Sequence, residues 1–355
     1  MQFDFTYSTQ PTRTLFGAGK IQRVGPELRA LGKHRALIIC TPSYQAMADT
    51  LKETLGDLGA GVFAQATVHT PIEVTEGALT VLANSKADGI IALGGGSAIG
   101  LSKALAYRTG LLQLILPTTY SGSEATQILG QTEHGIKTTV QDPAILPEVV
   151  IYDPELTLDL PVDLSITSAM NAMAHALEAM YAQNAHPLTA LMATEAIRQL
   201  REALPILHHT PQDLAARSQA LYGAWLAGTL LGNLGMSLHH KLCHVLGGLF
   251  NLPHAATHTI LLPHTIGYNQ QYASTQLRPA CTLFGEHLGT GLYDYAASLK
   301  APLALKVFGL TQSDLEHAAT QAVAKPYWNP GPINRDVILQ ILQNAWEGVR
   351  PAGHE

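Results

Sequence analysis

The chain has 355 residues, of which 46% are hydrophobic and 14% are charged, and its formal net charge is −6. This length allows two domains with an ample core, and so few charges indicate extensive burial, part of it in the interface of an expected homodimer. The charge balance disfavours nucleic-acid partners, and the apolar runs are interrupted well before the ~20 residues of a membrane span. With no secretory leader at the N-terminus and an odd count of three cysteines, we expect a cytoplasmic protein with reduced thiols.

Residues 1–157 alternate short apolar runs with helical stretches, the pattern of an α/β domain. The runs are almost continuously apolar, as expected for parallel strands that are covered on both faces. The expected strands are 36–40, 61–66, 89–95, 112–117 and a last strand that begins at Val149.

The strand at 89–95 leads directly into GGGSAIG. Three glycines allow backbone N–H groups to approach a phosphate, and Ser97 opens a helix whose N-terminus carries positive partial charge. GGGS is not the GxGxxG fingerprint, and a glycine turn that serves only strand-to-helix packing is the alternative. The next predicted strand also ends in small hydroxyl residues, and two such loops at neighbouring strand ends favour a dinucleotide site. The residues assigned to this cofactor are Thr41, Gly94, Gly95, Gly96, Ser97, Thr118, Thr119 and Ser121.

Residues 158–355 show almost only helical periodicity, which predicts an all-α domain. The connection between the two domains is short, so we expect them to pack closely and leave a cleft. Helices are expected to begin near Asp163, His186, Pro211, Met236, Pro263, Leu292, Thr311 and Ile333.

The stretch 236–264 contains six of the 16 histidines. His240 and His244 are four residues apart and share one helix face, and Gly247-Gly248 followed by Pro253 can close that helix and return His254 near its start. Unrelated polar histidines on helices are the alternative, which so dense a group disfavours. The cluster is typical of a metal site, a proton relay or an anion pocket.

In chain order, FGAGKI, GGGS, PTTYSGSE, KTTVQDPAILPEVVIYDPELT and HKLCHVLGGLFNLPHAATHTILLPH resemble motifs of the iron-type (group III) alcohol dehydrogenase superfamily. The resemblance covers nearly the whole chain, and its last motif is highly specific. It implies an N-terminal dinucleotide-binding α/β domain, a C-terminal helical domain, and an active site between them.

In that superfamily one Asp and three His hold the metal, and the matching positions here are Asn171, His175, His240 and His254. The amide of Asn171 is a weaker, neutral ligand, and Gly100 stands where the phosphate-loop motif has an acid. Both departures resemble the branch that reduces the activated C=C bond of maleylacetate to 3-oxoadipate in aromatic-compound degradation. That branch implies NADH or NADPH as cofactor and no required metal.

The resemblance also implies catalytic roles. Lys137 could reach the nicotinamide, or be a solvated turn lysine, and Tyr120 could donate to substrate or pack beside the phosphate loop. We considered three alternatives: a metal-dependent dehydrogenase of small alcohols or aldehydes, a lyase on the dehydroquinate synthase fold, and an inactive nucleotide-binding subunit. The implied catalytic residues are His175, His240, His244, His254, Lys137 and Tyr120.

Overall fold

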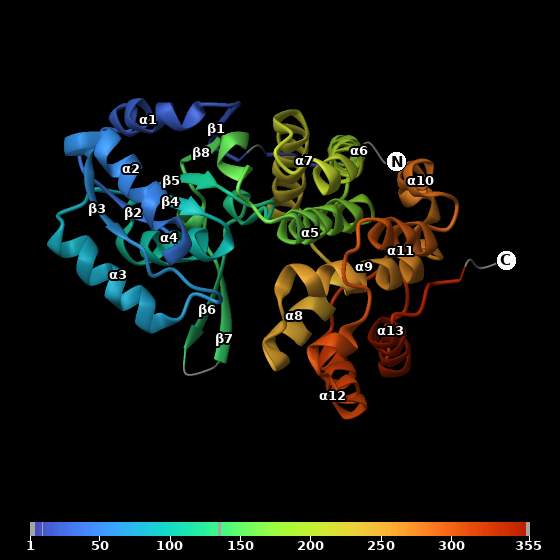
Figure 1. Cartoon of the computed structure of the whole chain (residues 1–355). Helices are drawn as coiled ribbons and strands as arrows, with labels where there is room; N and C mark the ends of the chain where they lie inside the picture. The colour runs from blue at the N-terminus through green and yellow to red at the C-terminus, as the bar shows by residue number, and fades with distance from the viewer. Residues whose placement is uncertain (1–3, 9, 134–135, 353–355) are drawn as a thin grey trace. The chain divides into compact units, whose positions relative to one another are not determined.

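The computed structural model describes residues 4–8, 10–133 and 136–352. It divides into two compact units (Figure 1). The sheet unit is Tyr7–Leu160 with Gln212–Leu221, and the helical unit is Met1–Thr6, Pro161–Pro211 and Tyr222–Glu355. The predicted fold class, an α/β domain followed by an all-α domain, is confirmed. Within the described part of the chain, each helix is too short or too polar to cross a membrane.

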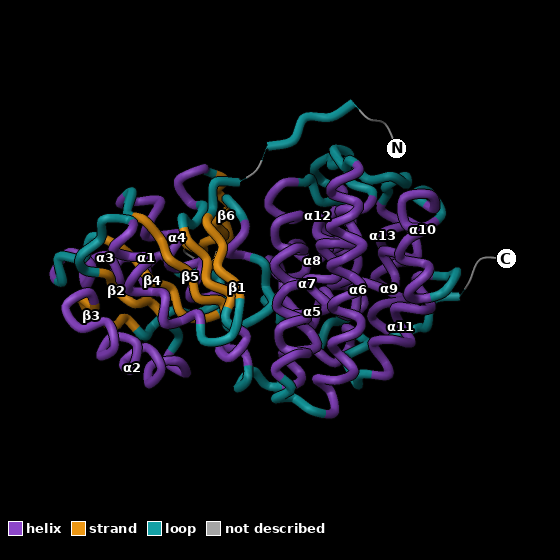
Figure 2. The backbone as a smooth tube through the Cα atoms, turned by 90° about the horizontal axis from the view of Figure 1, so that it is seen from above, coloured by secondary structure: helices purple, strands orange, loops and turns teal. Residues whose placement is uncertain are grey.

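The sheet unit is built on six parallel strands in the order β1-β8-β5-β4-β2-β3, drawn in orange in Figure 2. Since β4 lies between β2 and β5, the loops that follow these three strands meet at one edge of the sheet. The strands are β1 (Arg13–Phe16), β2 (Ala36–Ile39), β3 (Gly59–Phe63), β4 (Gly89–Gly94), β5 (Leu112–Pro117) and β8 (Val149–Tyr152).

Successive residues of the central strands face opposite sides, so an unbroken apolar run supplies two cores. Ile38 and Ile91 pack on one side with α1 (Val24–Ala30) and α2 (Gln45–Leu55). On the other side, Leu37 and Ile90 pack with residues of α3 (Ile72–Asn84) and α4 (Gly96–Thr109). Both faces are therefore covered, as the hydrophobic pattern predicts.

An antiparallel hairpin of β6 (Ile128–Glu133) and β7 (Ile136–Gln141) forms a second, two-stranded sheet. Neither this hairpin nor β1 was expected from the sequence. The described part of the hairpin is mostly half-buried or exposed and rich in polar residues, so its apolar pattern is weak.

The helical unit is organised around α5, which is buried from Ser165 to Met180. It packs against α6 and α9, and α9 in turn packs against α8 and α11. The helices are α5 (Val162–Met180), α6 (Pro187–His209), α7 (Leu214–Asn233, whose first residues belong to the sheet unit), α8 (Leu238–Phe250), α9 (His254–Gln270), α10 (Ser274–Phe284), α11 (Leu288–Ser298), α12 (Gln312–Val323) and α13 (Arg335–Glu347).

Two helix boundaries differ from the sequence prediction. A helix was expected to begin near Pro263, but α9 begins at His254 and continues through that proline. An interior proline costs about 3 kcal/mol, and burial of α9 from Thr257 to Ile266 outweighs it. α8 likewise passes through Gly247-Gly248 and ends at Asn251, whose φ of 52° is the left-handed conformation of a helix C-cap.

Candidate active site

The glycines of the phosphate loop, between β4 and α4, have three different tasks. Gly94 has a φ of 149°, a conformation that L side chains rarely adopt. A Cβ on Gly95 would lie 2.7 Å from the Thr119 side chain, so the loops after β4 and β5 touch only because that Cβ is missing. A Cβ on Gly96 would meet nothing within 4 Å. The open space at Gly96, at the N-terminus of α4, fits a phosphate.

The hydroxyl loop after β5 carries the other predicted cofactor residues. The Thr118 hydroxyl is fully buried and has no hydrogen-bond partner among the described residues, while Thr119 and Ser121 are half-buried. Thr41 lies at the carboxyl end of β2, where its hydroxyl is 2.9 Å from that of Ser43. The cofactor residues predicted from sequence thus come together on three neighbouring strand ends of one sheet.

Tyr120 lies in the same loop but is fully buried. Its hydroxyl accepts a hydrogen bond of 3.2 Å from the guanidinium of Arg217, which also donates to the Leu160 carbonyl at 3.0 Å. Burial raises the pKa of Tyr120. The backbone of Lys137 pairs with Thr132 in the hairpin, and its side chain lies outside the described part of the structure. The catalytic roles of Tyr120 and Lys137 stay predictions.

Sequence reasoning missed two buried ionisable residues behind the hydroxyl loop, Lys103 and Glu124. Lys103 donates to the Ser123 carbonyl at 2.5 Å, the Thr126 hydroxyl at 2.9 Å and the Ile128 carbonyl at 3.0 Å. Burial lowers its pKa to about 7 and raises that of Glu124 to about 6. Lys103 therefore fixes the chain that leaves the hydroxyl loop. The signal was present, because Lys103 is the lysine that ends GGGSAIGLSK.

In the helical unit the histidines are organised by a buried carboxylate, Glu178 of α5. It accepts hydrogen bonds from the Ser237 hydroxyl at 2.7 Å, the Ser237 N–H at 3.1 Å and the His239 N–H at 2.8 Å. Its Oε2, which accepts from the Ser237 N–H, is also 2.5 Å from His240 Nδ1. The carboxylate thus occupies the N-terminus of α8. Although burial opposes it, hydrogen bonding to His240 lowers the pKa of Glu178 to about 2.

The Glu178 carboxylate fixes the direction of a chain of hydrogen bonds through His240 and His175. Because Glu178 only accepts, His240 Nδ1 carries the proton and its Nε2 presents a lone pair. His175 Nδ1 lies 2.7 Å from that Nε2 and therefore donates to it. A proton taken up by His175 would be balanced through His240 by the Glu178 charge, as in a catalytic triad. Glu178 follows His175 by three residues, a helical spacing that was visible in the sequence.

A second chain runs through His239 and His258. The Thr265 hydroxyl donates to the Leu261 carbonyl at 3.0 Å and so accepts from His239 Nδ1 at 2.8 Å. His239 Nε2 then accepts from His258 Nδ1 at 3.0 Å. Burial lowers the pKa of His239 to about 3 and lowers that of His258 well below its usual range. Both rings are therefore neutral at pH 7.

The four predicted catalytic histidines lie near one another but differ in exposure. His175 and His240 are buried, and their ring centres are 4.9 Å apart. His244 is exposed, with its ring centre 6.3 Å from that of His240. His254 is also exposed and lies 4.4 Å from His258, whose ring is 5.1 Å from that of His240. The pattern suits an inner relay with outer rings that solvent or a substrate can reach.

The positions that would hold a metal in this superfamily do not fit a divalent cation as arranged. His175 Nδ1 and His240 Nε2 are 2.7 Å apart, whereas two nitrogens on one tetrahedral ion are about 3.4 Å apart. The oxygen of Asn171 is buried and has no partner among the described residues, but it is neutral. No carboxylate belongs to this set, and Glu178 is already satisfied by α8.

Among the described residues, His239, Cys243 and His258 form a group whose ligand atoms lie within 4.8 Å of one another. Its imidazoles are bonded to each other, and burial raises the pKa of the Cys243 thiol well above its usual range. Because a metal needs the thiolate, this group also fits poorly.

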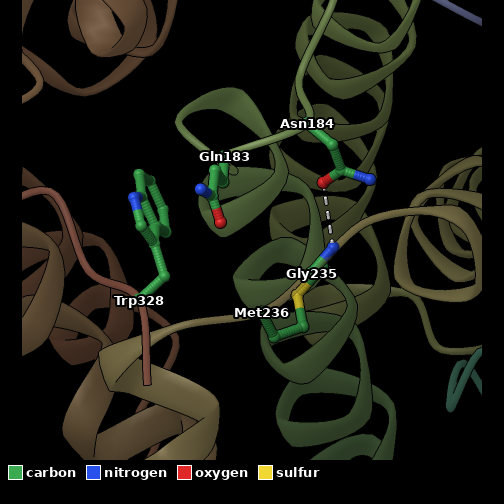
Figure 3. Close-up of a pocket in the computed structure, with 5 residues that line it drawn as sticks. All are labelled: Gln183, Asn184, Gly235, Met236 and Trp328. Atoms are coloured by element: carbon green, nitrogen blue, oxygen red, sulfur yellow. Dashed lines mark hydrogen bonds between the residues drawn. The ribbon is translucent and has the colours of Figure 1, made fainter. Parts of the chain in front are cut away.

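A pocket of about 270 Å³ lies elsewhere in the helical unit (Figure 3). Its lining has no titratable side chain, and the Asn184 oxygen is held by the Gly235 N–H at 3.1 Å. It contains none of the predicted site residues, so we assign it no part in catalysis. It is lined by Gln183, Asn184, Gly235, Met236 and Trp328.

A phosphate cradle on a parallel sheet and a histidine relay in a helical domain define an NAD(P)-dependent oxidoreductase. The chain belongs to the iron-containing alcohol dehydrogenase family. Residues 11–154 match the family model described as iron-containing alcohol dehydrogenase, and residues 165–346 match its C-terminal counterpart.

Several similar proteins within the family are named maleylacetate reductase. A maleylacetate reductase from Rhizobium sp. (strain MTP-10005) is 53% identical over 98% of this chain and 99% of its own length. One from Sphingobium indicum is 47% identical over the same shares of the two chains. The crystal structure of maleylacetate reductase from Agrobacterium tumefaciens has a TM-score of 0.96 at 52% identity and covers 99% of this chain and all of its own.

Proposed function

We propose that this protein reduces the activated C=C bond of maleylacetate to 3-oxoadipate with NADH or NADPH, without a required metal. Full-length identity of 53% to a maleylacetate reductase supports the substrate. The observation that carries the chemistry is the chain from Glu178 through His240 to His175, a proton relay at the family's metal position. The test is oxidation of NADH with maleylacetate against a panel of simple alcohols and aldehydes. The cytoplasmic homodimer stays a prediction from composition.

The reaction needs a hydride and a proton. The bound dinucleotide supplies the hydride to the carbon β to the ketone of maleylacetate. The C=C electrons then move to the ketone oxygen as an enolate, and protonation of the α-carbon completes the reduction. An enone is already activated, so hydrogen-bond donors can stabilise the enolate without a Lewis acid.

The chain's residues divide these tasks. The open space at Gly96 and the N-terminus of α4 would hold the dinucleotide phosphates. The exposed rings of His244 and His254 would bind a substrate carboxylate or deliver the proton. His175, once protonated, would donate from Nε2 to the nascent enolate, and Glu178 balances that charge through His240.

The runner-up is a metal-dependent alcohol dehydrogenase. We expect full maleylacetate reduction at substoichiometric iron and zinc, because Asn171 offers only a neutral oxygen and the neighbouring imidazoles bond to each other. Elemental analysis beside an activity assay, with and without chelator, measures this. Asn171→Asp should increase metal occupancy, since it restores an anionic ligand. Loss of all activity on chelation, with recovery on adding a divalent ion, would favour the runner-up.

Both NADH and NADPH should support the reaction. Thr41 lies at the end of β2, where a carboxylate would bind the ribose 2′-hydroxyl and repel a 2′-phosphate. A threonine does not repel it. Steady-state kinetics with each cofactor measure the preference, and Thr41→Asp should shift it toward NADH. A preference of the parent protein for NADH beyond roughly a thousandfold, ~4 kcal/mol, contradicts this expectation.

A further inference from the structure

The segment between β3 and α3 carries two adjacent residues in a conformation that favours glycine. His69 has a φ of 64° and Thr70 a φ of 45°. For a β-branched residue this is a genuine outlier, and such strain persists only where surrounding contacts enforce it. The Thr70 carbonyl accepts from the Thr132 N–H at 3.3 Å, and Pro71 forms a bridge with Thr132 and caps α3. The strained pair is therefore held at its C-terminal end by the hairpin and by α3.

This strain places the Thr70 side chain against α4. A Cβ at position 100 would lie 2.5 Å from Thr70 Oγ1, so the hydroxyl has room only because residue 100 is glycine. Thr70 is only 4% exposed. The Thr70 side chain and any side chain at position 100 would therefore occupy the same space, so only one of them can be present.

The same face of α4 also carries Gly96 of the phosphate loop. Gly96 and Gly100 are four residues apart in α4 and share a face, separated by about 6 Å along the helix axis. Gly96 faces open space, whereas Gly100 is covered by Thr70. The Thr70 hydroxyl therefore lies about one helical turn from the place where a phosphate fits.

We propose that Thr70 donates a hydrogen bond to the pyrophosphate of the bound dinucleotide, and that Gly100 is required to admit it. A hydroxyl can donate a hydrogen bond to an anionic phosphate oxygen. This role rests on the dinucleotide part of the proposed function. It makes Thr70 a cofactor-binding residue that no sequence pattern indicates.

The test compares two isosteric substitutions in the same segment. Thr70→Val removes the hydroxyl, and we expect the Kd for NADH to rise about tenfold, as for loss of a hydrogen bond to a charged group. Thr75→Val is the matched control, since the buried Thr75 hydroxyl donates to the Pro71 carbonyl at 3.2 Å. It should leave the Kd within twofold. ADP-ribose, which contains the pyrophosphate, should show the Thr70 effect, and AMP, which lacks it, should not.

A second experiment tests the pairing with Gly100 without relying on Thr70→Val. Gly100→Ala should displace Thr70 and weaken NADH binding about as much. In a Thr70→Gly background, which keeps the left-handed backbone and frees the space, Gly100→Ala should add little. Equal NADH affinity of the parent and both Thr70 variants overturns the proposal, as does an equal loss in Thr75→Val. A parent protein that binds no NADH would instead contradict the proposed function.

Discussion

Alanine in place of His240 or of His244 should lower kcat for maleylacetate at least about 100-fold, the usual contribution of a general acid or a positioned donor. His240 joins Glu178 to His175, so its loss removes the relay and leaves the buried Glu178 without its ring partner. His244 is exposed and able to meet a substrate. His254→Ala should act more on KM, because an exposed ring at the start of α9 suits a substrate carboxylate. Steady-state kinetics of each variant separate its effect on kcat from its effect on KM.

The control is His209→Ala, an exposed histidine in the last turn of α6. It should leave kcat and KM unchanged. Glu178→Gln separately tests the role of the carboxylate that holds His240. It preserves shape but replaces one acceptor by an amide donor, so kcat should fall although every histidine remains. Near-parent kcat in both His240→Ala and His244→Ala would refute the relay, and proton delivery would then fall to water, Tyr120 or Lys137.

Hydrophobic pattern was enough to locate the central sheet because its strands are buried on both faces. β2, β4, β5 and β8 lie where unbroken apolar runs predicted strands. The β6–β7 hairpin could not be found in this way, because its pattern is mixed. Local helix signals failed at Pro263 for another reason: packing of α9 against its neighbours overrides the preference of one residue.

The candidate site shows a similar division. Residue type and spacing brought out the histidines and the phosphate loop, since both depend on local sequence. The carboxylate that orients the histidines was missed although Glu178 lies one turn from His175, because a single acid on a helix carries no motif. The contact between Thr70 and Gly100 joins residues far apart in the chain and depends on an unusual φ. A single sequence has no signal for this contact.

Stability should fall steeply as the pH drops from about 6.5 toward 5. Burial lowers the pKa of His239 to about 3, that of His264 to about 4, and that of His258 well below its usual range. Below pH 6.5 the unfolded chain binds protons at these rings and the native protein does not, so unfolding is favoured as pH falls. At pH 5 each buried neutral ring lowers the free energy of unfolding by about 2 kcal/mol, which is a large share of the ~5–15 kcal/mol typical of a protein.

Urea unfolding at pH 7, 6 and 5 measures this loss. His264→Gln is the informative variant, because it removes one titrating ring outside the relay. It should make the pH dependence shallower by roughly a third, since two of the three rings remain. Glu178 stays ionised between pH 6.5 and 5, because hydrogen bonding to His240 holds its pKa at about 2, so it does not offset this loss of stability. An unfolding midpoint that stays constant from pH 7 to 5 would mean that these histidines bind protons in the native protein. The Thr265–His239–His258 chain would then have to rearrange, because a protonated His239 can no longer accept from His258.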